Sequence, residues 1–189
     1  MIKAFIIFAA LLNGEAKEMK VNTTESVITW TGKKVVGKSH TGTLKLQEGT
    51  LQMDGNKLTG GSFVIDMSTL EDTDLSGEWK AKLEGHLKSD DFFGVETYPT
   101  AAFVITEAKS TGKGSYNVTG DVTIKGKTET ISFPATIKEV DGTYEATADL
   151  SFDRSKFDVR YGSDSFFDNL GDNVIENNID LSIKLIVGK

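Results

Sequence analysis

The stretch ISFPATIKEVDGTYEATADLSF, residues 131–152, decides the fold class of this chain. Apolar side chains alternate with polar ones along residues 131–137 and again along residues 144–152. A period of two places the apolar side chains of a strand on one face. Asp141-Gly142, between the two runs, is a strong hairpin signal. The stretch therefore predicts two antiparallel strands, each with one apolar and one polar face.

The same alternation recurs along most of the chain, with turn residues between the runs. Asp54-Gly55-Asn56 and Gly126-Lys127-Thr128 are two such turns. About eight strands at regular spacing suit an up-and-down barrel or a two-sheet sandwich. The chain has no internal repeat or linker, which predicts one domain. The further runs are residues 27–31, 41–47, 63–67, 101–106, 122–125 and 179–187.

Two segments break the strand period and favour helical turns. In residues 76–87, Trp79, Leu83 and Leu87 are spaced by four and form one helical face. Residues 164–170 form the second segment, and the following glycine is suited to a helix end. We expect both segments to cover the open ends of the sheet. Each has a Phe-Phe pair in it or close to it, at Phe92-Phe93 and Phe166-Phe167.

Composition excludes several classes of function. The chain has 189 residues, of which 38% are hydrophobic and 26% charged, so it can form a substantial core. It has no cysteine, which excludes disulfides, a thiol nucleophile and thiolate metal sites. Its net charge of -7 makes nucleic acid an unfavourable partner.

The N-terminal residues have the features of a secretory signal peptide. Lys3 supplies a positive charge, and residues 4–12 form an apolar run too short to span a bilayer. Gly14 and Ala16 are small residues suited to a cleavage site. We therefore expect a signal peptide over residues 1–16 and a single domain over residues 17–189. The mature chain is expected to have no membrane-spanning segment.

Motifs for catalysis and metal binding are absent from the sequence. There is no G-x-S-x-G turn for a serine nucleophile. The two histidines, His40 and His86, lack the short spacing of metal ligands. Asp90 and Asp91 are adjacent, so in an extended chain they point to opposite sides. We therefore expect no catalytic residue, no metal and no cofactor.

The two arginines leave two interpretations open. Arg154 and Arg160 lie in FDRSKFDVRYGS, residues 152–163, at the end of a clear strand. A guanidinium at a barrel rim can bind an anionic head group. Alternatively, each arginine forms an ion pair with a nearby acid. The nearby acids are Asp153, Asp158 and Asp164.

The stretch GHLKSDDFFGVETYPTAAF, residues 85–103, resembles a pattern of the YceI-like family of bacterial polyisoprenoid-binding proteins. The family pattern is H-L-x-S-x-D-F-F-x-V-x-x-Y-P-x-x-x-F. The H-x-G at residues 40–42 and the hairpin at residues 116–135 are similar to family segments, and the resemblance covers most of residues 21–189. WKAK at residues 79–82 departs from it, since many members have a more acidic or arginine-bearing run there.

The resemblance implies a fold and a function. The implied fold is an all-β, eight-stranded antiparallel lipocalin-like barrel, with one or two short helices covering it. The implied function is to bind, carry or sequester a long-chain isoprenoid-like or fatty lipid in an apolar tunnel, in the periplasm. A homodimer is left open. The alternatives are a non-enzymatic stress-related or structural interaction domain with a filled barrel and no ligand, or an enzyme on the same scaffold.

Candidate site residues follow from the alternation and the resemblance together. Each wall residue can equally be plain core, because a filled barrel shows the same pattern. The expected tunnel wall is Phe63, Ile65, Phe92, Phe93, Phe103, Ile105, Ile124, Phe133, Phe152 and Phe157. The expected rim is His40, His86, Tyr98, Arg154 and Tyr161.

Overall fold

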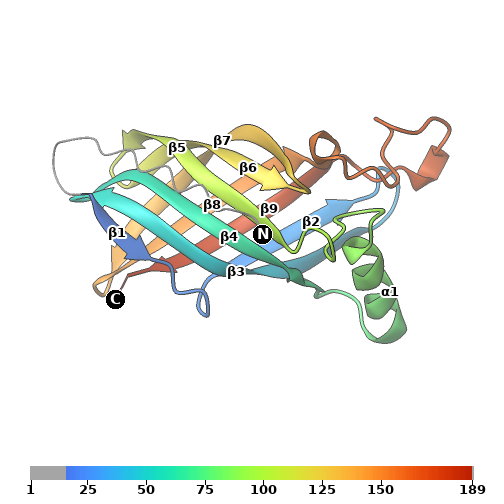
Figure 1. Ribbon diagram of the computed structural model, residues 1–189, viewed down its shortest axis with the longest axis horizontal. Coiled ribbons are helices and arrows are strands. Elements are labelled where there is room, and N and C mark those ends of the chain that lie inside the picture. Colours follow the sequence, from blue (N-terminus) through green and yellow to red (C-terminus); the bar gives the residue numbers. More distant parts are fainter. Residues whose placement is uncertain (1–15, 189) are drawn as a thin grey trace.

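The computed structural model describes residues 16–188, and the signal peptide expected over residues 1–16 lies outside this range except for Ala16. Within residues 16–188 the chain forms nine strands, one α-helix and two 3₁₀ helices (Figure 1). The strands are β1 (Lys17–Lys20), β2 (Val27–Lys33), β3 (Ser39–Asp54), β4 (Lys57–Asp72), β5 (Thr100–Gly112), β6 (Ser115–Ile124), β7 (Lys127–Val140), β8 (Thr143–Asp153) and β9 (Asn178–Val187). The helices are α1 (Gly77–Lys88), η1 (Arg154–Phe157) and η2 (Gly171–Asn173).

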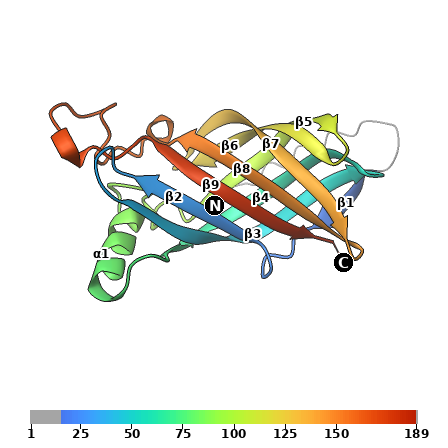
Figure 2. The same cartoon turned by 180° about the vertical axis from the view of Figure 1, so that it is seen from behind.

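Eight of the strands in this range close an antiparallel barrel. Strands β2, β9, β8, β7, β6, β5, β4 and β3 pair in that order, and β3 pairs with β2 to complete the ring. Figure 2 shows β2, β9 and β8 side by side on the face hidden in Figure 1. The predicted eight-stranded barrel is confirmed, and the two-sheet sandwich is excluded because every barrel strand has a neighbour on both sides.

Strand β1 shares one position in the barrel with β2. Residues 39–44 of β3 pair with β2, whereas residues 50–53 pair with β1. The turn between β1 and β2 is held by the Asn22 side chain, which accepts from the backbone N–H of Thr24 at 3.1 Å. The two short strands therefore act as one interrupted strand along β3.

The hairpins follow the turn residues of the sequence. Asp141 and Gly142 both have positive φ, at 51° and 77°, as a type I′ turn requires. Gly55 has φ of 58° at the β3–β4 turn. Strands β3 and β4 both extend to that turn, so they are longer than the predicted runs at residues 41–47 and 63–67.

Helix α1 is present as expected, but its apolar face differs from the prediction. Leu83 and Leu87 are half-buried and face the barrel interior, whereas Trp79 is 72% exposed. The helix covers only the rim of the barrel end (Figure 1), so its first turn projects beyond the apolar surface. The expected packing of Trp79 is therefore wrong.

The helix expected over residues 164–170 is not formed. The backbone N–H groups of Phe166 and Phe167 both bond to the carbonyl of Ser163, which makes an isolated turn. Asn169 has φ of 62°, in the left-handed region, and this conformation stops a right-handed helix from continuing. Only the 3₁₀ turn η2 follows, so the Phe166-Phe167 pair remains exposed instead of covering the barrel.

Candidate functional site

A cavity of about 450 Å³ runs along the barrel interior. Side chains from all eight barrel strands line it, and almost all of them are apolar. Polar lining residues gather where α1 and residues 154–177 lie, the right-hand end in Figure 1. We call this the open end. The arrangement gives an elongated apolar space with a polar entrance.

Tyr116 closes the opposite end of the barrel. Its hydroxyl donates to the carbonyl of Asn56 at 3.1 Å and accepts from the backbone N–H of Leu58 at 3.2 Å. Leu51, Met53 and Leu58 are buried in the same cluster as Tyr116. Packed side chains and paired polar groups therefore close this end of the barrel. A ligand can enter the cavity only from the open end.

Nine of the ten expected wall residues line the cavity. They are Phe63, Ile65, Phe92, Phe93, Phe103, Ile105, Ile124, Phe133 and Phe152. Phe157 is the exception and is a correction to the expected position. It is buried on η1 and packs edge-on against Phe152, with 5.7 Å between ring centroids, so it supports the wall from behind. Contact with a ligand stays a prediction for the other nine.

Four of the five expected rim residues line the cavity near the open end. They are His40, His86, Arg154 and Tyr161. His86 and Tyr161 pack edge-on with 4.3 Å between ring centroids, and both contact Phe92. Tyr98 lies away from the cavity, exposed beside Gly126 of the β6–β7 turn. Tyr98 therefore lies at the open end without lining the cavity, which corrects its expected place in the rim.

The segment with the two acids and two phenylalanines forms the inner cover of the open end. Phe92 and Phe93 are buried against the cavity, whereas Asp90 and Asp91 are exposed. Backbone bonds from Phe93 to Leu87 and from Val95 to Lys88 fold this segment back under the end of α1. The turns therefore place both phenylalanines toward the cavity and both aspartates toward solvent.

Arg154 is buried at this end, with 1% of its surface exposed. Its guanidinium donates to the backbone carbonyls of Val159, Ile175 and Glu176 at 2.8–3.1 Å, and forms no ion pair within residues 16–188. Burial lowers its pKa, while nearby acids act in the opposite direction. The expected ion pair is therefore wrong for Arg154. It is correct for Arg160, which bonds to Asp158 at 2.6 Å.

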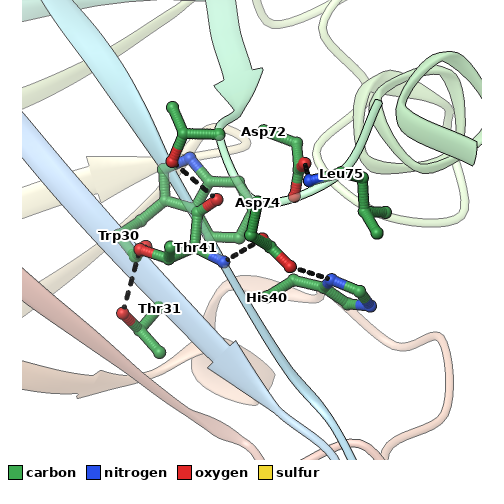
Figure 3. A network of polar contacts seen from close by, with 8 residues as sticks. Trp30, Thr31, His40, Thr41, Asp72, Asp74 and Leu75 are labelled. Atoms are coloured by element: carbon green, nitrogen blue, oxygen red, sulfur yellow. Dashed lines mark hydrogen bonds and ion pairs between the residues drawn. The ribbon is translucent and has the colours of Figure 1, made fainter. Parts of the chain in front are cut away.

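A polar network lies where β3, β4 and the start of α1 meet (Figure 3). Asp74 bonds to the His40 ring at 3.0 Å and accepts from the Thr41 backbone at 2.8 Å. Asp72 is fully buried, and one of its oxygens accepts from Leu75 at 2.7 Å. Its other oxygen has no hydrogen-bond partner among residues 16–188, and the Asp74 carboxylate lies close by.

The two carboxyl groups of this network have opposite pKa shifts. Burial and the proximity of Asp74 raise the pKa of Asp72. The pKa of Asp74 is lowered, because hydrogen bonds from Thr41 and His40 outweigh its burial. Asp72 is therefore the carboxyl group of the pair that takes up a proton more readily as pH falls. One ligand atom from each of His40, Asp72 and Asp74 lies within 4.8 Å of the others, which makes them the described residues best placed for a cation.

Several cavity residues were not among the sequence predictions. Leu83 and Leu87 of α1 contribute from the helix, and Lys33, Lys34 and Lys38 line the entrance. The pattern KKVVGK at residues 33–38, between two strands, is the signal that could have located the lysines. Alternation identifies inward-facing strand residues but gives no information on loops.

A family model described as a YceI-like domain matches residues 19–187. The chain belongs to the YceI-like family. A UPF0312 protein of Pseudomonas putida is 36% identical over 97 residues, which cover 50% of this chain and 47% of that protein. A UPF0312 protein of Pseudomonas fluorescens is 35% identical over 97 residues. These matches span about half the length of the curated relatives.

Solved structures share the YceI-like fold at lower identity. Burkholderia cenocepacia BcnA matches with a TM-score of 0.68 and 24% identity, over 88% of this chain and 98% of that one. A polyisoprenoid binding domain from Saccharophagus degradans matches with a TM-score of 0.65 and 13% identity, over 90% and 97%. Within residues 16–188, no helix has the length and apolar character to cross a membrane.

Proposed function

We propose that this YceI-like protein binds a long-chain isoprenoid-like or fatty lipid inside the barrel and carries or sequesters it. The observation that carries the proposal is the elongated apolar cavity whose polar lining residues, apart from Thr147, lie at one end. Its volume lies within the range of about 300–1,000 Å³ that is typical of ligand pockets. An apolar chain fits this space, and a polar head group fits its entrance.

The physical basis for binding is the removal of hydrocarbon from water. Each buried CH₂ contributes about 0.8 kcal/mol before ordering costs. The lining is made of aromatic and branched aliphatic side chains, which recognise shape and length more than chemistry. Selectivity for a head group then rests on His40, His86, Arg154 and Tyr161.

The proposal includes a non-catalytic role in the periplasm, with no cofactor. The apolar run at residues 4–12 and the small residues after it support export through a signal peptide. The intact mass of protein isolated from a periplasmic fraction tests this part, and a mass that includes residues 1–16 would contradict it. Gel filtration with light scattering tests whether the protein is a homodimer.

Lipid binding is tested on protein purified under native conditions. The protein is extracted with organic solvent and the extract is examined by mass spectrometry. We expect one prenyl or fatty lipid at near-stoichiometric amount. A clean extract, together with no uptake of a prenyl quinone or prenyl phosphate, would falsify the proposal and favour the alternative of an interaction domain with a filled barrel.

A matched pair of variants on β7 links binding to the cavity. Ala135 lines the cavity, whereas Thr136 is the next residue and does not. Ala135→Trp fills the space and is expected to reduce lipid uptake about tenfold or more, the effect of losing about 1.4 kcal/mol. Thr136→Trp is expected to bind like the unmodified protein. Circular dichroism shows whether each variant is folded.

A further inference from the structure

Exposed apolar side chains gather at the open end of the barrel. Ten large apolar residues are exposed within residues 16–188, and seven of them surround this end. The remaining three are Val27, Val104 and Val140. An apolar surface concentrated in one place on a protein marks an interaction site. The seven are Val35, Val36, Trp79, Tyr98, Tyr161, Phe166 and Phe167.

The β2–β3 loop forms the first part of this surface. Val35 and Val36, at its tip, are 59% and 56% exposed. The loop backbone is fixed, because the Val35 N–H bonds to the carbonyl of Val174 at 3.0 Å and Lys33 accepts from Glu176 at 2.8 Å. The backbone hydrogen bonds therefore hold the side chains of Val35 and Val36 toward solvent.

Trp79 on α1 forms the second part. It projects from the helix, and Lys82 Nζ lies 5.2 Å from the centre of its ring. Tryptophan prefers the boundary between lipid and water, because its ring is apolar and its N–H is polar. Phe166 and Phe167 form the third part, on the loop before η2.

Lysine side chains lie beside the first two parts of this apolar surface. Lys34 and Lys38 flank the valines, and Lys82 accompanies Trp79. These three lysines form no ion pair within the described part of the chain, whereas Lys33 and Lys80 pair with acids. Their charge contrasts with the net charge of -7 for the whole chain. The loop after η1 carries Asp164, Asp168 and Asp172 and is the less favourable side for an anionic partner.

We propose that the open end docks on an anionic lipid bilayer through the β2–β3 loop and α1. Val35, Val36 and Trp79 enter the boundary between head groups and acyl chains, and Lys34, Lys38 and Lys82 contact lipid phosphates. Apolar contact and basic charge act together in such interfacial binding. Lys34, Lys38 and α1 border the cavity entrance. A lipid can therefore pass between membrane and barrel without crossing water.

The test measures binding of the full-length protein, as purified from cells, to vesicles by sedimentation. Vesicles of phosphatidylglycerol with phosphatidylcholine are compared with vesicles of phosphatidylcholine alone. We expect binding to the anionic vesicles, weaker binding at high salt, and a blue shift of tryptophan fluorescence that is lost in Trp79→Phe. Intact mass confirms the same N-terminal form in all variants.

Matched variants locate the docking surface. Val35→Asp/Val36→Asp is expected to reduce partitioning about tenfold or more. Val104→Asp/Val140→Asp changes two valines of 48% and 46% exposure away from the open end and is expected to leave it unchanged. Lys34→Glu/Lys38→Glu is expected to weaken binding to anionic vesicles only.

Three results would overturn the docking proposal. They are absence of vesicle binding, equal losses in both valine pairs, and a stable dimer that is abolished by Val35→Asp/Val36→Asp. Vesicle binding needs no bound ligand, and lipid extraction needs no vesicle. Failure of docking is therefore distinguishable from failure of the proposed lipid binding.

Discussion

Lys125 Nζ donates a hydrogen bond to the backbone carbonyl of Phe92 at 2.8 Å. The same ammonium donates to the carbonyls of Asp90 and Asp158, at 3.2 and 3.3 Å. One side chain from the β6–β7 turn thus joins the inner cover of the cavity to the segment after η1. Phe92 is therefore held in place by a residue distant in sequence.

Lys125→Met is expected to lower the free energy of unfolding by about 2 kcal/mol, because three carbonyls, two of them in partly buried contacts, lose a charged donor. Chemical denaturation measures this change. Lys127→Met is the matched control, since Lys127 is exposed and lies 3.9 Å from Asp158. We expect the control to change stability by less than about 0.5 kcal/mol. Equal effects of the two substitutions would show that the three carbonyl contacts contribute nothing.

Tyr116→Phe is expected to destabilise the closed end by about 1–2 kcal/mol. The substitution removes a donor to Asn56 and leaves the N–H of Leu58 without a partner in a buried place. Tyr144→Phe removes only a 3.4 Å contact with the Asn56 side chain and serves as the control. The melting temperatures of both variants test this prediction. A larger decrease for Tyr144→Phe than for Tyr116→Phe would contradict it.

Gly120→Ala is expected to destabilise the barrel by about 1–3 kcal/mol through overpacking. A Cβ atom at this position would lie 2.5 Å from Cζ of Phe103, a cavity-wall residue. Gly112→Ala is the control, because the nearest atom to its Cβ is 3.9 Å away. Unfolding in denaturant compares them. If neither substitution changes the free energy of unfolding, the Phe103 side chain can move aside to accommodate a methyl group, which would contradict the prediction.

The stability of the Asp72→Asn variant, relative to that of the unmodified protein, is expected to increase as pH rises. A carboxyl group whose pKa is raised on folding binds more protons in the folded state. The unmodified protein therefore loses stability as pH rises from the ordinary pKa of 3.8 through the raised value. Asparagine keeps the acceptor for Leu75 but does not ionise. The stability difference, variant minus unmodified protein, should thus increase above about pH 4.

Unfolding free energies at several pH values between about 4 and 8 measure this difference. Asp149→Asn, at an exposed position on β8, controls for the loss of one negative charge. A difference that stays flat or falls with rising pH would show that folding does not raise the pKa of Asp72.

Strand positions were predictable because alternation is a local property. In β7 and β8, the apolar residues on the predicted face line the cavity with the exception of Tyr144, and Asp141-Gly142 forms the predicted turn. Seven of the ten expected wall residues follow from the same rule. Phe92 and Phe93 also line the cavity, but they lie in turns after α1 and came from the family resemblance. Phe157 fails because it lies on η1 after the strand has ended, where a period of two no longer applies.

Residues outside the strands depended on the tertiary structure. Arg154 has aspartates nearby in sequence, yet its guanidinium bonds to carbonyls of residues 159, 175 and 176. Trp79 has the spacing of a buried helical residue, yet the barrel surface ends before reaching it. In both cases, chain segments distant in sequence determine whether the side chain has a contact partner and which one.

The sequence by itself determined the strand pattern, the hairpin turns and the apolar character of the interior. These depend on the alternation of side chains and on the backbone conformations that each residue permits. Only the tertiary structure decided that β2 and β3 close the barrel around a cavity, and that Val35, Val36 and Trp79 gather at its open end. Barrel closure and the clustering of exposed residues bring together segments that are far apart in the sequence. A local sequence pattern contains no information on which distant segments meet.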